Sequence, residues 1–272
     1  MRLGPVLHRE GAFGGAGKRL GLGWDVAGTV DATGVATAWG VGDEVVALDH
    51  GMVKPLGTHA EYVVVDAGAV AVAPRATAAA HAAHAATLPL NGLTAAQALD
   101  LLDLAPGASL LVTGAAGAVG GYAVQLAAHR GLAVTALARA GDAELVRSLG
   151  ARHLVTDLAE VPGGAVSGGG VDAVLDAAVL GEPALAWVRD GGAYAGVVPQ
   201  SGPDPVRGIR VAAVEVAADG ARLAELVRLV DEGVLTLRVA ETYALDDAAK
   251  AHARLAAGGV RGRLVLVPGA GS

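Results

Sequence analysis

Residues 110–131 read LLVTGAAGAVGGYAVQLAAHRG, an apolar run followed by glycines and then by a helical pattern. This order predicts a buried strand, a tight glycine turn and a helix that ends at Gly131. In such a turn Gly117 would let the backbone approach a pyrophosphate, and Gly120 would let the helix pack on the strand. The free amides and the positive dipole of a helix N-terminus favour phosphate groups. We therefore expect a dinucleotide site, although Ala115 stands where the usual motif has its first glycine.

The residues that follow this turn indicate which nucleotide it binds. No G-K-[ST] sequence is present, which excludes a P-loop, and the motifs of short-chain dehydrogenases are missing. A site that prefers NAD places Asp or Glu after the second strand, where the carboxylate bonds the ribose 2′-hydroxyl. Here that strand ends in Ala138 and Arg139, and an arginine would bind a 2′-phosphate. This favours NADP(H), and Asp142 is expected to cap the next helix instead.

Strands and helices alternate from residue 109 onward. Strands are predicted at 109–114, 132–138, 153–157, 169–178, 193–198 and 208–216, with helices between most of them, including 181–192 and 220–233. This alternation predicts right-handed crossovers and a doubly wound parallel sheet. The first ninety residues instead suggest short β segments at 24–30, 42–48 and 59–66, and an alanine-rich helical stretch over 76–103 is broken at Pro89.

The composition excludes several classes of protein and site. The net charge of −7 disfavours nucleic acid as a partner, and no apolar run approaches the length of a membrane span. No signal peptide is recognisable, so a cytoplasmic protein is expected. The absence of cysteine removes disulfides, thiolate nucleophiles and sulfur-ligated metals. His81 and His84 share a face of the alanine-rich helix and are expected to be solvated.

Several ordered motifs together resemble the medium-chain dehydrogenase/reductase superfamily, and within it the zinc-independent quinone oxidoreductases. They are GWDVAGTV, VGDEVVAL, GTHAEYVVV, ATLPLNGLTAAQAL, LLVTGAAGAVGGYAVQLA, VDAVLDAA and GRLVLV, and the similarity runs from about Arg9 to Pro268. The resemblance implies a GroES-like β domain formed by 1–90 and 235–272, with an inserted Rossmann NADP-binding domain at 91–234. It also implies hydride transfer from NADPH, and a homodimer is expected.

The resemblance further assigns residues to the cofactor. These are Thr94, Ala116, Gly117, Ala118, Val119, Gly120 and Arg139, together with Ala177, Val197 and Val198 on the nicotinamide side. Arg263 is expected to be either a ligand contact or a solvated strand residue. Zinc-dependent members carry His-Glu where this chain has Trp24-Asp25, and tryptophan cannot ligate zinc. We therefore expect no metal, and acceptors that are already activated, such as quinones or α,β-unsaturated carbonyls.

The substrate-side candidates are Trp24, Asp25, His59 and Asn91. Trp24 is expected to line a pocket or the core, Asp25 to accept a structural hydrogen bond, and His59 to donate a proton or to serve structure. Tyr62 is expected to pack in the core. No catalytic acid is assigned, because an acceptor of this kind can take its proton from water.

Three functions remain open at this stage. The first is an NADPH-dependent quinone or enone reductase, the second is enoyl reduction or another tailoring step on a biosynthetic intermediate, and the third is a nucleotide-binding sensor or scaffold. The N-terminus is expected to be shortened relative to the family, because only a tail with Arg9 and Gly11 matches the family's opening segment. A shortened β domain would lack one wall of the substrate cleft, and we therefore expect NADPH binding with poor reduction of general quinones.

Overall fold

The computed structural model describes residues 20–34, 37–51, 54–75, 81–161, 170–200 and 202–269. The chain forms two compact units. The first contains the described residues up to Leu93, together with Ala217–Gly233 and the chain from Leu237, and the second contains Thr94–Val216 and Val234–Thr236. Arg9 and Gly11, on which the expectation about the N-terminus rests, lie outside the described residues.

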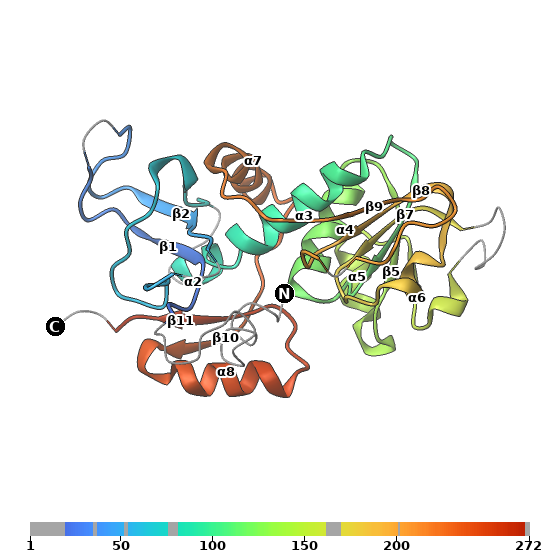
Figure 1. Ribbon diagram of the computed structural model, residues 1–272. Coiled ribbons are helices and arrows are strands. Elements are labelled where there is room, and N and C mark those ends of the chain that lie inside the picture. The colour runs from blue at the N-terminus through green and yellow to red at the C-terminus, as the bar shows by residue number, and fades with distance from the viewer. Residues whose placement is uncertain are drawn as a thin grey trace. The chain divides into compact units, whose positions relative to one another are not determined.

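The second unit is built on a six-stranded parallel sheet (Figure 1). In order across the sheet, the strands are β6 (His153–Val155), β5 (Ala133–Leu137), β4 (Ser109–Thr113), β7 (Val171–Asp176), β8 (Val188–Gly196) and β9 (Arg210–Ala213). The α/β fold with a parallel sheet is therefore confirmed. The strand order reverses beside β4, where open α/β sheets place their ligands at the carboxyl ends of the strands.

Apolar strands and short helices bury the core of this unit. Leu111, Val174 and Tyr194 lie in one buried cluster with Trp187 and Ile209. The helices are α4 (Ala118–His129), α5 (Ala143–Ser148), α6 (Glu182–Leu185) and most of α3 (Pro89–Leu102), with the 3₁₀ turns η2 (Ala140–Asp142) and η3 (Leu158–Glu160).

The helix predicted over 181–192 is wrong beyond its first turn. The structure keeps only α6, and β8 already begins at Val188. The two glycines at 191 and 192 lie inside β8, next to an irregularity in its pairing with β7. Gly191 has a φ of +67°, so these glycines form a bulge in a strand where the sequence suggested the end of a helix.

The first unit contains two small sheets. Strands β1 (Asp25–Thr29), β2 (Glu44–Leu48) and β3 (Val70–Val72) form an antiparallel sheet in that order, and β10 (Val239–Ala244) pairs in parallel with β11 (Arg263–Val267). The remaining elements are α2 (His81–Ala85), the start of α3, α7 (Gly220–Asp231), α8 (Ala248–Ala257), η1 (Ala67–Ala69) and η4 (Leu245–Asp247). Pro89 is the first residue of α3, where a proline is well tolerated.

Helix α7 differs from the expected domain arrangement. The sequence placed residues 220–233 with the parallel sheet, but the structure packs α7 on β3 and η1 of the first unit. Gly220 makes this packing close, because a Cβ at this position would lie 2.5 Å from the carbonyl oxygen of Val70.

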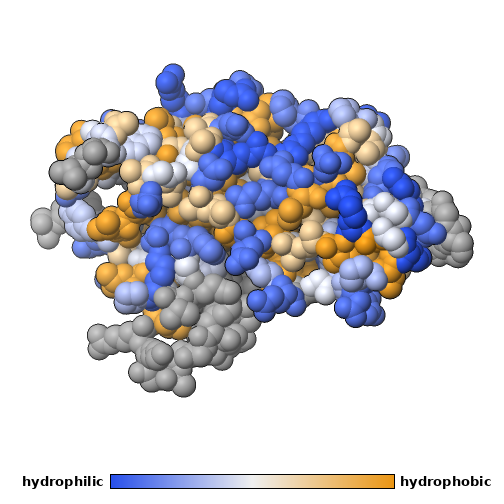
Figure 2. Space-filling model, turned by 45° about the horizontal axis from the view of Figure 1, so that its top comes forward, coloured by the Kyte–Doolittle hydropathy of each residue, from blue (hydrophilic) through white to orange (hydrophobic). Residues whose placement is uncertain are grey.

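The strand predicted at 59–66 is absent. Residues 59–66 form no strand in the structure, and β3 at 70–72, which was not predicted, pairs with β2 instead. Consequently the core position expected for Tyr62 is wrong, since Tyr62 is 76% exposed and Val64 is 96% exposed. Alternation of apolar residues buries a face only where neighbouring strands position it, and no described strand pairs with this segment. Apolar residues also reach the surface elsewhere, interspersed with polar ones, as Figure 2 shows for one face.

No helix in the described part of the chain is long and apolar enough to cross a membrane.

Candidate functional site

The glycine turn between β4 and α4 is closed by backbone contacts that exclude side chains. Gly114 has a φ of +59°, and the Gly117 amide donates to the Gly114 carbonyl over 2.8 Å. A Cβ on residue 120 would lie 2.3 Å from the Gly114 oxygen and 2.9 Å from the Ala115 Cα. At residue 117 a Cβ would meet the same oxygen at 3.0 Å. The first turn of α4 therefore lies directly on the glycine turn.

The N-terminus of α4 suits an anion. Gly117 is the N-cap residue and supplies no side-chain capping bond, and no acidic residue occupies the first turn. The first amides of a helix have no partner within the helix, and they carry the positive end of its dipole. Ala118, Val119 and Gly120 supply these amides at the carboxyl end of β4. This arrangement fits the pyrophosphate of a dinucleotide.

Arg139 lies two residues beyond the end of β5, the neighbour of β4 in the sheet. The residue is exposed, and no ion pair is seen for its guanidinium in the described part of the chain. Asp142 holds the N-cap position of α5 but makes no capping bond with its side chain, so the predicted capping bond is wrong. Asp142 is buried instead.

The segment after β7 is held by one buried carboxylate. The Asp176 side chain is 0% exposed and accepts four hydrogen bonds. The donors are the Thr113 hydroxyl at 2.5 Å, the Tyr194 hydroxyl at 2.6 Å, and the amides of Leu180 at 2.7 Å and Gly181 at 2.8 Å. Burial, and then the bond to Asp176, raise the pKa of the Tyr194 hydroxyl, which keeps it a donor. Ala177, predicted to line the nicotinamide side, is the first residue of the segment held in this way.

The other predicted cofactor residues of this unit lie at strand ends or on α3. Ala116 is buried within the glycine turn. Val197 and Val198 directly follow β8, with Val197 buried. Thr94 is buried on α3. Together with Ala177, the valines lie at the carboxyl ends of β7 and β8, the edge that also carries the glycine turn.

Asp25 in the first unit is committed to two structural bonds. One carboxylate oxygen accepts from the Leu90 amide at 2.7 Å, in the first turn of α3, and the other pairs with the Arg263 guanidinium. The carboxylate therefore ties β1 to β11 and to the start of α3. Arg263, expected as either a ligand contact or a solvated residue, is partly buried and paired instead.

His59 lies beside a second histidine and a cation. The ring centroids of His59 and His252 are 5.5 Å apart, and Arg263 is close enough to act on His59 electrostatically. Burial, and then the charges of His252 and Arg263, lower the pKa of His59 to about 4. The imidazole is therefore uncharged at neutral pH.

The remaining substrate-side candidates are held by backbone groups. The Trp24 indole donates to the Gly51 carbonyl at 3.1 Å and meets the His50 ring edge-on. Asn91 is fully buried, and its amide donates to the Thr87 carbonyl at 3.1 Å, one helical turn earlier. Within the first unit the structure thus brings Asp25 and His59 to the same residue, Arg263, whereas Trp24 and Asn91 have separate partners.

Known proteins are similar to this chain in sequence and in fold. Residues 149–266 match the family model described as zinc-binding dehydrogenase. The chain is 32% identical over 274 residues to the pikromycin polyketide synthase component PikAII of Streptomyces venezuelae, covering 90% of this chain and 7% of that protein. It is 33% identical over 208 residues to the chloroplastic NADPH-dependent alkenal/one oxidoreductase of Arabidopsis thaliana, covering 70% and 51%.

Among solved structures, the quinone oxidoreductase from Coxiella burnetii superposes with a TM-score of 0.79 at 25% identity, covering 96% of this chain and 82% of that one. The chain belongs to the medium-chain dehydrogenase/reductase superfamily. The resemblance to this superfamily and to its quinone oxidoreductases is thereby confirmed. The chain spans less than two thirds of the length of either curated relative.

The family model carries zinc in its name, but this chain offers few side chains that could ligate zinc. The chain has no cysteine, and in the described ranges no three His, Asp or Glu side chains come together as a metal site. Sequence reasoning missed two features of this superfamily member, the Asp176 network and the contact of His59 with His252. An acidic residue closing the apolar run VLD was a usable signal for Asp176. His252 lies on α8, far from His59 in sequence, and had no local signal.

Proposed function

We propose that this chain is an NADP(H)-dependent oxidoreductase that transfers hydride to a quinone or an α,β-unsaturated carbonyl. One observation carries the proposal: the tight glycine turn at the N-terminus of α4 and the exposed Arg139 both follow the carboxyl ends of neighbouring parallel strands. The relative from Arabidopsis, named for NADPH-dependent action on alkenals and enones, supports the cofactor and the acceptor class.

Different residues of the second unit would bind the pyrophosphate, the 2′-phosphate and the nicotinamide of the cofactor. The first amides of α4 would hold the pyrophosphate, and Arg139 would pair with the 2′-phosphate. Thr94, Ala177, Val197 and Val198 would border the nicotinamide side. When bound, NADPH supplies the hydride, and the chain supplies position and the exclusion of water.

We further propose that turnover needs no zinc. Trp24 occupies the position where zinc-dependent members have a ligating histidine, and its indole nitrogen donates to Gly51. Tryptophan offers no lone pair for a metal, and the chain lacks the cysteines that such sites use. Activity with an activated acceptor should therefore survive treatment with a strong chelator. Activity that disappears with chelation and returns with zinc would contradict this part.

The experiment that tests the cofactor assignment is a titration of NADPH and NADH into the parent chain and Arg139→Ala. Loss of a hydrogen bond to a charged group costs about 1.5–3 kcal/mol, roughly a tenfold to hundredfold loss of NADPH affinity. NADH affinity should be unchanged. Arg147→Ala is the matched control, because Arg147 is also exposed, on α5 of the same unit. Equal affinities for the two cofactors in the parent would refute the assignment.

A second candidate acceptor is a biosynthetic intermediate, reduced as an enoyl or similar group. The match to a polyketide synthase component over 90% of this chain favours it. A panel of quinones, simple enones and enoyl thioesters, each offered with NADPH, separates the two candidates. Tight NADPH binding without turnover of any acceptor would instead support the nucleotide-binding sensor or scaffold.

We also propose that the chain forms a homodimer. Strand β9 lies at the edge of the six-stranded sheet, and no described strand pairs with its outer side. Proteins usually pair or cover such an edge. A molar mass near 26.6 kDa in light scattering at micromolar concentration would contradict the dimer.

A further inference from the structure

The Asp176 carboxylate joins three parts of the second unit. All three lie near the carboxyl ends of β4, β7 and β8, which we call the dinucleotide edge. Thr113 is the last residue of β4, immediately before the glycine turn, and Tyr194 lies on β8. Leu180 and Gly181 close the segment 177–181 that follows β7. A single buried group therefore fixes the ends of two strands and the loop between β7 and α6.

The same network sets the spacing between this loop and the glycine turn. The Thr113 hydroxyl donates to Asp176 and accepts from the Ala178 amide at 3.0 Å. A Cβ added at Gly114 would lie 3.3 Å from the Cβ and from the amide nitrogen of Ala178. The loop thus lies against the first glycine of the turn.

The loop conformation itself depends on these bonds. Val179 adopts a φ of +60°, a region that β-branched residues rarely occupy, and Gly181 adopts a φ of +70°. Glycine adopts a positive φ readily, but Val179 is strained, and such a conformation persists only where surrounding contacts enforce it. Here the enforcing contacts are the amides of Leu180 and Gly181 on the Asp176 carboxylate.

We propose that Asp176 is a positioning residue for the nicotinamide half of the cofactor, because it holds the loop 177–181 against the glycine turn. This inference rests on the proposed NADP(H) site and goes beyond it by assigning a task to a residue with no direct cofactor contact. The adenosine half, which would depend on Arg139 and the α4 amides, does not require this loop.

Asp176→Asn tests the proposal with little change in size. An amide retains one oxygen for the Leu180, Gly181 and Tyr194 donors, but its nitrogen is a donor and would face the Thr113 hydroxyl, which could then no longer donate to residue 176. The substitution also removes a negative charge near an anionic ligand. Electrostatics alone would therefore tighten NADPH binding, whereas loss of positioning weakens it, so the two effects have opposite signs.

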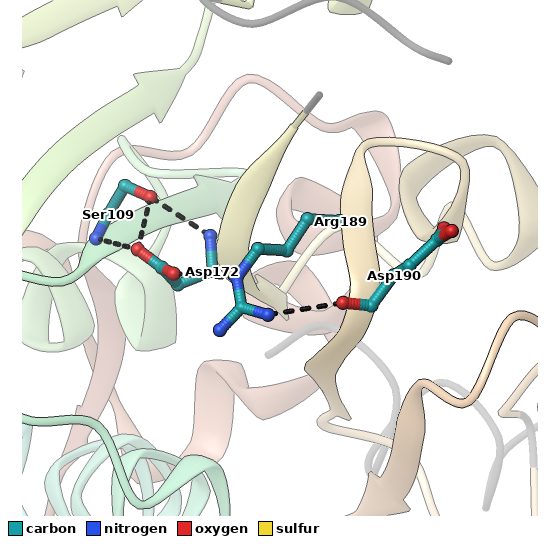
Figure 3. Close-up of polar contacts among 4 residues, drawn as sticks. All are labelled: Ser109, Asp172, Arg189 and Asp190. Atoms are coloured by element: carbon teal, nitrogen blue, oxygen red, sulfur yellow. Dashed lines mark hydrogen bonds and ion pairs between the residues drawn. The ribbon is translucent and has the colours of Figure 1, made fainter. Parts of the chain in front are cut away.

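Asp172→Asn is the matched control. Asp172 lies at the other end of the same strand and accepts bonds from the Ser109 amide and hydroxyl and from Arg189 (Figure 3). Both variants exchange one carboxylate of β7 for an amide, but only one of them lies at the dinucleotide edge. Thr113→Val is the second test variant, because it removes the hydroxyl that links Ala178 to Asp176 and serves if the amide variant fails to fold.

The measurement compares two ligands by calorimetry: NADPH, and 2′,5′-ADP, which carries only the adenosine half with its 2′-phosphate. We expect Asp176→Asn and Thr113→Val to bind NADPH about tenfold more weakly, as for one lost hydrogen bond to a charged group. Their affinity for 2′,5′-ADP should stay within about twofold of the parent, and Asp172→Asn should bind both ligands like the parent.

Three results would overturn the inference. They are unchanged or tighter NADPH binding by the test variants, an equal loss for both ligands, or the same loss in Asp172→Asn. In each of these cases the parent still binds NADPH, so the proposed function stands. A parent chain that binds neither ligand would refute the proposed function and, with it, the inference.

Discussion

Replacing Gly120 by alanine should disable the dinucleotide turn. A Cβ at this position would lie 2.3 Å from the Gly114 carbonyl oxygen, 2.8 Å from the Gly114 carbonyl carbon and 2.9 Å from the Ala115 Cα. All three are backbone atoms, so no flexible side chain can move aside. Real Cβ contacts stay beyond 3.0 Å, and α4 must therefore retreat by about 0.7 Å, the difference between 3.0 and 2.3 Å.

That retreat has two measurable costs. Overpacking of this kind destabilises a fold by about 1–3 kcal/mol. An amide placed about 2.9 Å from a phosphate oxygen would move to about 3.6 Å, where the hydrogen bond is lost. One such bond to a charged group is worth about 1.5–3 kcal/mol, so NADPH affinity should fall at least about tenfold.

The assay combines urea denaturation with NADPH titration of Gly120→Ala, the parent and Gly40→Ala. Gly40 is the control because its φ is not positive and an added Cβ would meet only the Asp43 carboxylate, at 3.8 Å or more. The control should keep the parent's stability and affinity. A Gly120→Ala variant as stable as the parent that also binds NADPH equally well would refute the argument for the turn.

Three further predictions concern stability and surface. The Ser109 amide, followed by further donors, lowers the pKa of Asp172 to about 2. After allowance for solvent screening, Asp172→Asn should cost about 1 kcal/mol at neutral pH, and the difference from the parent should vanish as pH falls from about 4 to 2 in urea titrations. Burial, and then His252, lower the pKa of His59 to about 4, so the unfolded chain binds more protons between about pH 6.5 and 4. As pH falls through this window, the unfolding free energy of the parent should therefore decrease more than that of His59→Gln. An equal change in unfolding free energy for the two proteins between pH 7 and pH 5 would contradict this. Tyr62→Ser should change the unfolding free energy by less than about 0.5 kcal/mol, because the ring is exposed, and a larger loss by the same assay would show that the segment is buried in solution.

The elements that the sequence predicted well are those whose signal is local. The glycine turn, β4 and α4 lie within one continuous stretch, and the six parallel strands each follow from an apolar run flanked by turns. Pro89 marked the start of α3 for the same reason, because its effect on the backbone is confined to its neighbours.

The wrong secondary-structure predictions are those in which an element depends on residues far away in the sequence. Residues 59–66 carry the alternation of a strand, yet the edge of β2 that they would need is taken by β3. The short α6 and the early start of β8 depend on parallel pairing with β7, which no pattern within 181–192 reveals. Helix α7 packs on β3 because Gly220 permits close approach to Val70, a contact between residues far apart in sequence.

The substrate-side candidates show the same limit, and their contacts bear on the chemistry. Both oxygens of Asp25 accept hydrogen bonds, from Leu90 and from Arg263, so the carboxylate already has a structural role. Burial, and then the charges of His252 and Arg263, keep the imidazole of His59 uncharged at neutral pH, and a neutral imidazole is a weak acid. His59 is therefore poorly suited to deliver a proton during turnover. An acceptor that needs prior protonation would be reduced poorly by such a site, whereas a quinone or an enone accepts hydride first and can take its proton from water. The uncharged state of His59 agrees with the acceptor class that we propose for this chain.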